Sequence, residues 1–220
     1  MRFGRRWGSS RSRSRITDDF HRLYYEARER TWFQTSWLGT RAQKCPLDLW
    51  VYQEIIYERR PDTIVETGTA WGGSAFFLAS MCDLVGNGRV ITIDIGAAEE
   101  RPQHERVSYL RGSSIDPEIA QQVRAAIRDD DRVMVILDSD HSRDHVLEEL
   151  KTYAPLVTPG DYCIVEDTNV NGNPILPEFG PGPAEAVAAF LRETNDYEVD
   201  RSKEKFFMTF NPRGYWRKRR

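Results

Sequence analysis

Residues 62–74 read DTIVETGTAWGGS, and this stretch decides the fold. Its first half is a short run of β-branched residues, which is typical of a buried strand. The strand leads directly into glycines, and the apolar run that follows has the length and spacing of a helix. Glycines at such a junction let the backbone approach a ligand closely, and the start of the next helix offers free N–H groups. The stretch therefore predicts a strand, a ligand-binding turn and a helix.

The same alternation continues toward the C-terminus. Strands are expected in 89–95, 106–114, 132–140 and 160–168, and helices in 72–86, 116–128, 144–157 and 184–194. Segments 197–201 and 206–212 are expected to finish the sheet as an antiparallel pair. Strands alternating with helices at this spacing predict an α/β fold, with a mostly parallel seven-stranded sheet and helices on both faces.

The segments before residue 61 and after residue 212 have a different composition. Six arginines fall within the first fifteen residues, and the chain ends with four consecutive basic residues. We expect a basic flexible tail at 1–16, a helical cap at 17–60, a ligand-binding domain at 61–212 and a basic tail at 213–220. The cap contains an amphipathic helix at 18–30, an aromatic stretch and a second helix that begins at Pro46.

Charge and cysteine usage exclude several classes of protein. The formal net charge of the 220 residues is -3, so nothing draws the whole chain to nucleic acid, although basic ends can bind an anionic polymer. Three cysteines without CxxC spacing indicate a reducing compartment. Neither a signal peptide nor an apolar run long enough for a membrane span is visible. We expect a cytoplasmic protein.

Ligands of open α/β sheets lie at the carboxyl ends of the strands, near the point where the strand order reverses. The glycine spacing here is G-x-x-x-G-G and does not match the dinucleotide pattern G-x-G-x-x-G. Glu66 would repel a pyrophosphate but suits the cationic amino-acid end of S-adenosylmethionine (SAM), and Asp94 suits ribose hydroxyls. We therefore expect SAM, with a nucleotide cofactor as the alternative. The expected cofactor residues are Glu66, Gly68, Thr69, Ser74, Asp94, Ser113, Ser114 and Asp138.

Carboxylates gather after two further strands, in LDSDH (137–141) and VEDTN (165–169). Several carboxylates in one cleft repel one another, and a divalent cation relieves that repulsion. Oxygen ligands favour Mg²⁺, with Mn²⁺ or Ca²⁺ possible, over zinc. The preferred metal ligands are Asp138, Glu166 and Asp167, with Asp140 as a substitute for Asp138. His141 lies beside them and suits a general base at neutral pH.

With these motifs assembled, the sequence resembles the cephalosporin hydroxylase / rhamnosyl O-methyltransferase family, which includes metal-dependent sugar O-methyltransferases. The resemblance is carried by VETGTAWGGSA (65–75), D-x-x-H (138–141) and GDYCIVED (160–167). It implies a Rossmann-like class I methyltransferase fold and a saccharide acceptor. It also implies metal binding by the three acids named above, His141 as the base, and a homo-oligomer, expected as a dimer. The arginine-rich ends are similar to those of a mycobacterial branch acting on the 1-hydroxyl of short methylmannosides in polysaccharide biosynthesis.

Three other functions stay open at this stage. A catechol-type or natural-product O-methyltransferase would share the cofactor and the metal, whereas a nucleotide-dependent oxidoreductase or an anionic-polymer-binding module would not. Residues 168–183 are rich in Gly, Pro and Asn and follow the second acidic motif. Long loops at this edge of a sheet are commonly functional, so we expect a lid over the acceptor.

Overall fold

The computed structural model describes residues 10–96 and 101–219. A seven-stranded sheet runs through its centre in the order β5-β4-β3-β6-β7-β9-β8. The first five strands in this order are parallel, and β9 pairs antiparallel with both β7 and β8. The strands are β3 (Thr63–Thr67), β4 (Arg89–Asp94), β5 (Val107–Arg111), β6 (Val133–Leu137), β7 (Tyr162–Val165), β8 (Tyr197–Val199) and β9 (Tyr215–Lys218). The predicted fold class is confirmed.

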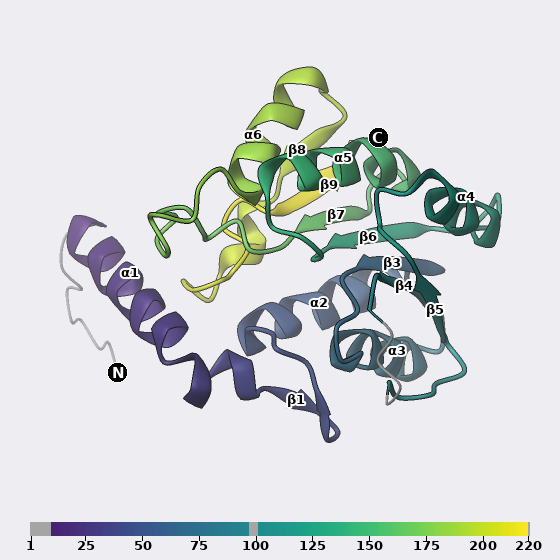
Figure 1. Cartoon of the computed structure of the whole chain (residues 1–220), viewed down its shortest axis with the longest axis horizontal. Coiled ribbons are helices and arrows are strands. Elements are labelled where there is room, and N and C mark those ends of the chain that lie inside the picture. Colours follow the sequence, from purple (N-terminus) through teal and green to yellow (C-terminus); the bar gives the residue numbers. More distant parts are fainter. Residues whose placement is uncertain (1–9, 97–100, 220) are drawn as a thin grey trace, which may run out of the picture.

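Helices cover both faces of this sheet (Figure 1). On one face the core joins strand residues to apolar residues of α4 (Pro117–Ala126), α5 (Arg143–Tyr153) and α6 (Pro183–Glu193). On the other face it joins them to α2 (Pro46–Arg59) and α3 (Gly73–Val85). The central strands β3, β6 and β7 are buried on both faces, which explains why their sequences show no alternation of apolar and polar residues. The cap helix α2 therefore belongs to the sheet core.

Local sequence signals set the ends of these helices. Pro46, Pro117 and Pro183 each occupy the first turn of a helix, where a missing N–H costs nothing. The Asp116 side chain accepts a hydrogen bond from the N–H of Glu118 and caps α4. Gly86 ends α3 in the left-handed conformation.

The N-terminal part lies beside the sheet. Helix α1 (Ser10–Glu26) leads through the short turns η1 (Arg28–Arg30) and η2 (Trp32–Gln34) into a hairpin of β1 (Ser36–Trp37) and β2 (Thr40–Arg41). Two contacts tie α1 to the loop after β7. Arg22 donates to the Pro174 carbonyl, and the Asn169 amide contacts the His21 ring at 3.0 Å. The cap thus reaches the carboxyl edge of the sheet.

Two predicted boundaries are wrong. Residues 10–16 are helical instead of tail, while residues 1–9 lie outside the described part. The last strand lies at Tyr215–Lys218, inside the predicted tail 213–220, and segment 206–212 is not a strand. Asp48 explains the second error, because its carboxylate accepts hydrogen bonds from the Phe210 N–H and the Tyr215 hydroxyl. Side-chain bonding to α2 replaces strand pairing in 206–212.

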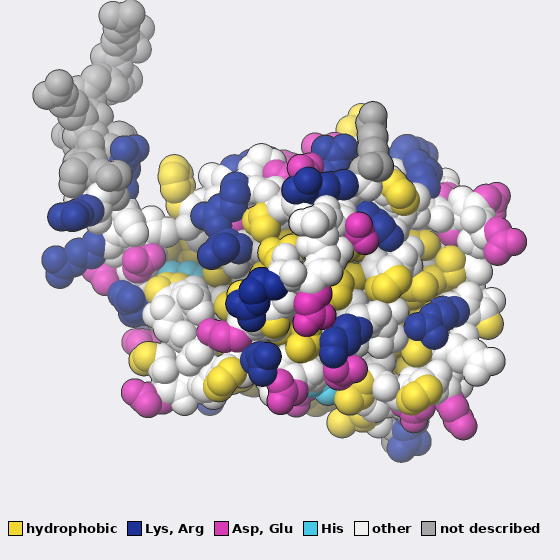
Figure 2. All heavy atoms as spheres, turned by 90° about the horizontal axis from the view of Figure 1, so that it is seen from above, with side chains coloured by type: hydrophobic (Ala, Val, Ile, Leu, Met, Phe, Trp, Pro, Cys, Tyr) yellow, Lys and Arg dark blue, Asp and Glu magenta, His cyan; other side chains and the backbone are white. Residues whose placement is uncertain are grey.

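Charge is unevenly distributed on the surface. Figure 2 shows Lys and Arg side chains gathered around the exposed end of α1, while basic and acidic side chains are mixed over the rest of that face. Among the described residues, no helix is both long and apolar enough to cross a membrane.

Candidate functional site

One cavity of about 620 Å³ opens at the carboxyl edge of the sheet. Pockets for small molecules and cofactors usually measure about 300–1,000 Å³, so the size suits a cofactor with its acceptor. Its walls come from the ends of β3 to β7 and from the N-terminal cap. Of the predicted cofactor residues, those that line the cavity are Gly68, Thr69, Ser74, Asp94, Ser113, Ser114 and Asp138.

The turn after β3 lines this cavity. Gly68 has φ +84°, and a Cβ built on it would lie 1.8 Å from the Asp138 carbonyl oxygen. The strand ends of β3 and β6 therefore touch at this point. The Asp138 N–H donates to the Thr67 carbonyl at 3.1 Å, which fixes the direction in which the β6 end leaves the sheet. Only glycine allows both the backbone conformation and this close approach.

Asp94 ends β4 with its carboxylate already positioned. One oxygen accepts from the Ala70 N–H at 2.7 Å, the other from the Gly96 N–H at 2.6 Å, and Arg101 lies 3.4 Å away. The group borders the glycine turn, as expected for a residue that receives ribose hydroxyls. Its role as a ribose ligand stays a prediction.

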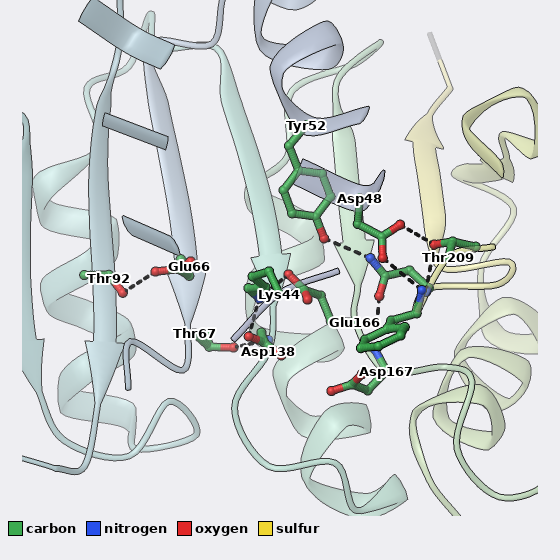
Figure 3. Close-up of polar contacts among 12 residues, drawn as sticks. Lys44, Asp48, Tyr52, Glu66, Thr67, Thr92, Asp138, Glu166, Asp167 and Thr209 are labelled. Carbon is green, nitrogen blue, oxygen red and sulfur yellow. Dashed lines mark hydrogen bonds and ion pairs between the residues drawn. The ribbon is translucent and has the colours of Figure 1, made fainter. Parts of the chain in front are cut away.

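Glu66 lies behind the cavity wall and is fully buried. One of its oxygens accepts from the Thr92 hydroxyl at 2.7 Å (Figure 3), while Oε1 has no hydrogen-bond partner among the described residues. Burial raises the pKa of this carboxyl. A buried oxygen without a partner fits a cationic group delivered by a ligand.

Ser113 and Ser114 follow β5 as predicted. The Ser114 hydroxyl contacts the His145 ring at 3.0 Å, and His145 is in turn 3.6 Å from the buried Glu149. The neighbouring Glu149 carboxylate raises the pKa of His145. His145 is thus engaged with these neighbours and is not part of the cluster that contains His141.

The acidic motifs come together after β6 and β7. Asp138, His141 and Asp167 each offer a ligand atom, and these atoms lie within 4.8 Å of one another. His141 Nε2 is 3.1 Å from Asp167 Oδ2, and both side chains are partly exposed. Two carboxylates and an imidazole at this spacing fit Mg²⁺ or Mn²⁺. Asp140 instead accepts from the Ser142 N–H at 2.7 Å.

Glu166 does not join these three residues. It is 4% exposed and accepts from the Lys44 ammonium at 2.5 Å. The same ammonium donates to Asp138, so that Lys44 lies between the two carboxylates (Figure 3). Burial lowers the pKa of Lys44, but the charges of Asp138 and Glu166 outweigh it and the net shift is upward. Glu166 as a metal ligand stays a prediction.

The cap supplies an aromatic wall, formed by Tyr25, Trp32 and Phe33. Tyr25 and Trp32 stack with ring centroids 5.1 Å apart, and Phe33 meets Trp32 edge-on at 5.4 Å. Val170 and Phe179, from the loop predicted to be a lid, also line the cavity. The N-terminal cap therefore forms part of the cavity wall.

Sequence reasoning missed Lys44. No motif marks it, since it stands between a short hairpin and a helix start without a charged neighbour. The number of acidic residues in the two motifs was the available indication of a buried cation. Several buried carboxylates need a positive charge nearby, and the sequence predicts only a metal ion for it.

Comparison with known proteins shows the family of this chain. The family model Rhamnosyl O-methyltransferase/CmcI matches residues 29–219. The rhamnosyl O-methyltransferase of Mycobacterium tuberculosis (strain ATCC 25618 / H37Rv) is 40% identical over 207 residues, covering 91% of this chain and 84% of the relative. That of Mycobacterium leprae (strain TN) is 39% identical over 206 residues, covering 91% and 89%.

This chain belongs to the rhamnosyl O-methyltransferase/CmcI family. It is a SAM-dependent O-methyltransferase, which confirms the predicted enzyme class. Among solved structures, an apo structure of CmcI is similar with a TM-score of 0.67 at 24% identity, over 86% of this chain and 77% of that one. A CmcI structure with Mg and SAM gives 0.62 at 24% identity, over 84% and 77%. These two likenesses concern the fold.

Proposed function

We propose that this family member transfers the methyl group of SAM to a hydroxyl of a saccharide, with a divalent cation bound at Asp138 and Asp167. The observation that carries the proposal is one continuous cavity with three kinds of wall. Asp94 and the glycine turn form the first, the cluster of Asp138, His141 and Asp167 the second, and the aromatic wall the third. Strand order puts Asp138 two strands and Asp167 three strands away from Asp94.

The residues of the cluster have separable roles in this proposal. A cation held by Asp138 and Asp167 would lower the pKa of an acceptor hydroxyl and orient it. His141 faces Asp167 through Nε2 at 3.1 Å. If Nε2 carries the ring proton and donates a hydrogen bond to Asp167, Nδ1 is the unprotonated nitrogen that would take the proton of the hydroxyl. Positioning two substrates in one cavity contributes roughly 7–11 kcal/mol toward the barrier.

A saccharide acceptor is supported by the aromatic wall, because aromatic rings pack against the C–H face of a sugar while hydroxyls reach the polar cluster. The rhamnosyl O-methyltransferases that resemble the chain over most of its length favour the same acceptor class. A methylmannoside 1-hydroxyl as the target, the lid role of 168–183 and the homodimer stay predictions.

The first test is calorimetric titration with S-adenosylhomocysteine (SAH), with and without Mg²⁺. Asp94→Ala is expected to weaken SAH binding at least tenfold, since hydrogen bonds to a charged group contribute about 1.5–3 kcal/mol each. Asp196→Ala, which removes an exposed carboxylate elsewhere, is the control and should bind normally. Equal affinity in both variants would remove Asp94 from the cofactor site, and no binding by the wild type would remove the proposal.

The acceptor wall is tested with Phe33→Leu, which keeps apolar volume but removes the ring. We expect the KM for a saccharide acceptor to rise roughly two- to tenfold, from the ~0.5–1.5 kcal/mol of an aromatic contact. SAH affinity should not change. Phe207→Leu is the matched control, because that ring is 81% exposed and does not line the cavity. A higher KM for a catechol but an unchanged KM for sugars would favour the catechol-type alternative.

A further inference from the structure

Lys44 lies inside the acidic site, but neither the motifs nor the proposed chemistry uses it. Its side chain is 5% exposed, and its ammonium contacts Asp138 and Glu166, whose side chains are 18% and 5% exposed. Glu66 adds a third negative charge to its surroundings. An ammonium that is buried at such a depth is stable only when it is paired.

The chain holds Lys44 in place through its backbone. The Lys44 N–H donates to the Thr35 hydroxyl at 3.0 Å, and the same hydroxyl lies 2.7 Å from the Trp32 carbonyl oxygen and 3.0 Å from the Lys44 carbonyl oxygen, its two acceptors. The next residue, Cys45, is buried and precedes α2. The lysine is therefore fixed on both sides by a folded hairpin and a core helix, and its ammonium is a built part of the site.

The ammonium is not arranged to act as a base. Its two charged partners are carboxylates, which accept hydrogen bonds from it and so hold the side chain in its charged ammonium form. It supplies a permanent positive charge that shares Asp138 with the candidate metal cluster. Two cations on one carboxylate in a low-dielectric site repel each other.

We propose that Lys44 is an internal counter-ion, which holds Asp138 and Glu166 together when no metal is bound and lowers the affinity of the site for the divalent cation. The inference rests on the metal site of the proposed function. It divides the acids of the site between two cations. Glu166 pairs with Lys44 behind the cavity wall, whereas Asp167 faces His141 on the open side. Asp138 belongs to both groups.

The test measures Mn²⁺ binding by calorimetry and thermal unfolding of the full chain, in EDTA and in saturating Mn²⁺. Lys44→Met should bind Mn²⁺ at least tenfold more tightly than the wild type. It should also unfold at a lower temperature in EDTA, with most of that loss recovered by Mn²⁺. Lys44→Gln keeps an amide donor for the two carboxylates and gives the same comparison if Lys44→Met does not fold.

Lys203→Met is the matched control. It removes the same group from a lysine that is 8% exposed and paired with Glu58 at 3.0 Å, so it should leave Mn²⁺ affinity at the wild-type value. Wild-type affinity, or weaker binding, in both Lys44 variants would overturn the role of Lys44 while leaving the metal site intact. Absence of Mn²⁺ binding in every variant would overturn both, and SAH titration would then still test the cofactor site separately.

Discussion

Replacing His141 by glutamine is expected to lower kcat by about 10²–10⁴-fold, the usual contribution of a positioned general base. The reason is geometric. His141 lies in the wall of the cavity within 3.1 Å of Asp167, so its ring is held where a metal-bound hydroxyl would lose its proton. Glutamine retains polarity and approximate size but cannot take a proton. Rates at saturating SAM and acceptor measure the effect.

Binding measurements on the same variant distinguish a general base from a metal ligand at position 141. Because His141 lies among the candidate metal ligands, its loss would also lower activity if it bound the cation. For a base, Mn²⁺ and SAH affinities of the variant stay within twofold of the wild type. Mn²⁺ binding that falls in parallel with kcat would reassign His141 to the metal. His104→Gln is the control. The His104 ring lies 3.0 Å from the Asp83 carboxylate and does not line the cavity.

The parallel part of the fold was predictable because its signals are local. Five apolar runs, four of them followed by a helix-length segment, are typical of a parallel sheet, and proline or glycine marks most helix ends. The C-terminal part was not predictable in this way. FFMTFNP looks like a strand, but the buried Asp48 takes hydrogen bonds from this segment, and Tyr215 to Lys218 pairs with β7 instead. Which segment forms the last strand thus depends on Asp48, a residue about 160 positions earlier in the chain.

The residues of the site likewise include some that local sequence signals predict and one that they do not. Asp94, Asp138, His141 and Asp167 follow strand ends, and strand ends of a parallel sheet meet at one edge, so their convergence followed from topology. Lys44 comes from a hairpin whose position depends on packing of the cap. Glu166 was correctly expected near Asp138, but the lysine between them could not be inferred, because nothing local in the sequence fixes where a loop lysine points.

Gly68→Ala is expected to lower the free energy of unfolding by about 3 kcal/mol or more. Two costs add at this position. The backbone has φ +84°, which penalises any Cβ, and the new methyl would lie 1.8 Å from the Asp138 carbonyl oxygen and 2.9 Å from the Ser139 Cα. Neither neighbour can yield easily, since both are backbone atoms at the end of β6. Chemical denaturation measures the loss.

Gly86→Ala separates the two costs. Gly86 has φ +68°, but nothing lies within 4 Å of the added Cβ, so only the conformational penalty of about 1–2 kcal/mol is expected. The excess loss in Gly68→Ala then reports the clash between the ends of β3 and β6. If Gly68→Ala remains folded in the cold, the displaced Asp138 should weaken Mn²⁺ binding, which Gly86→Ala should not do. Equal losses of stability with unchanged Mn²⁺ affinity would mean that the two strand ends move independently, and that the glycine turn does not position the metal cluster.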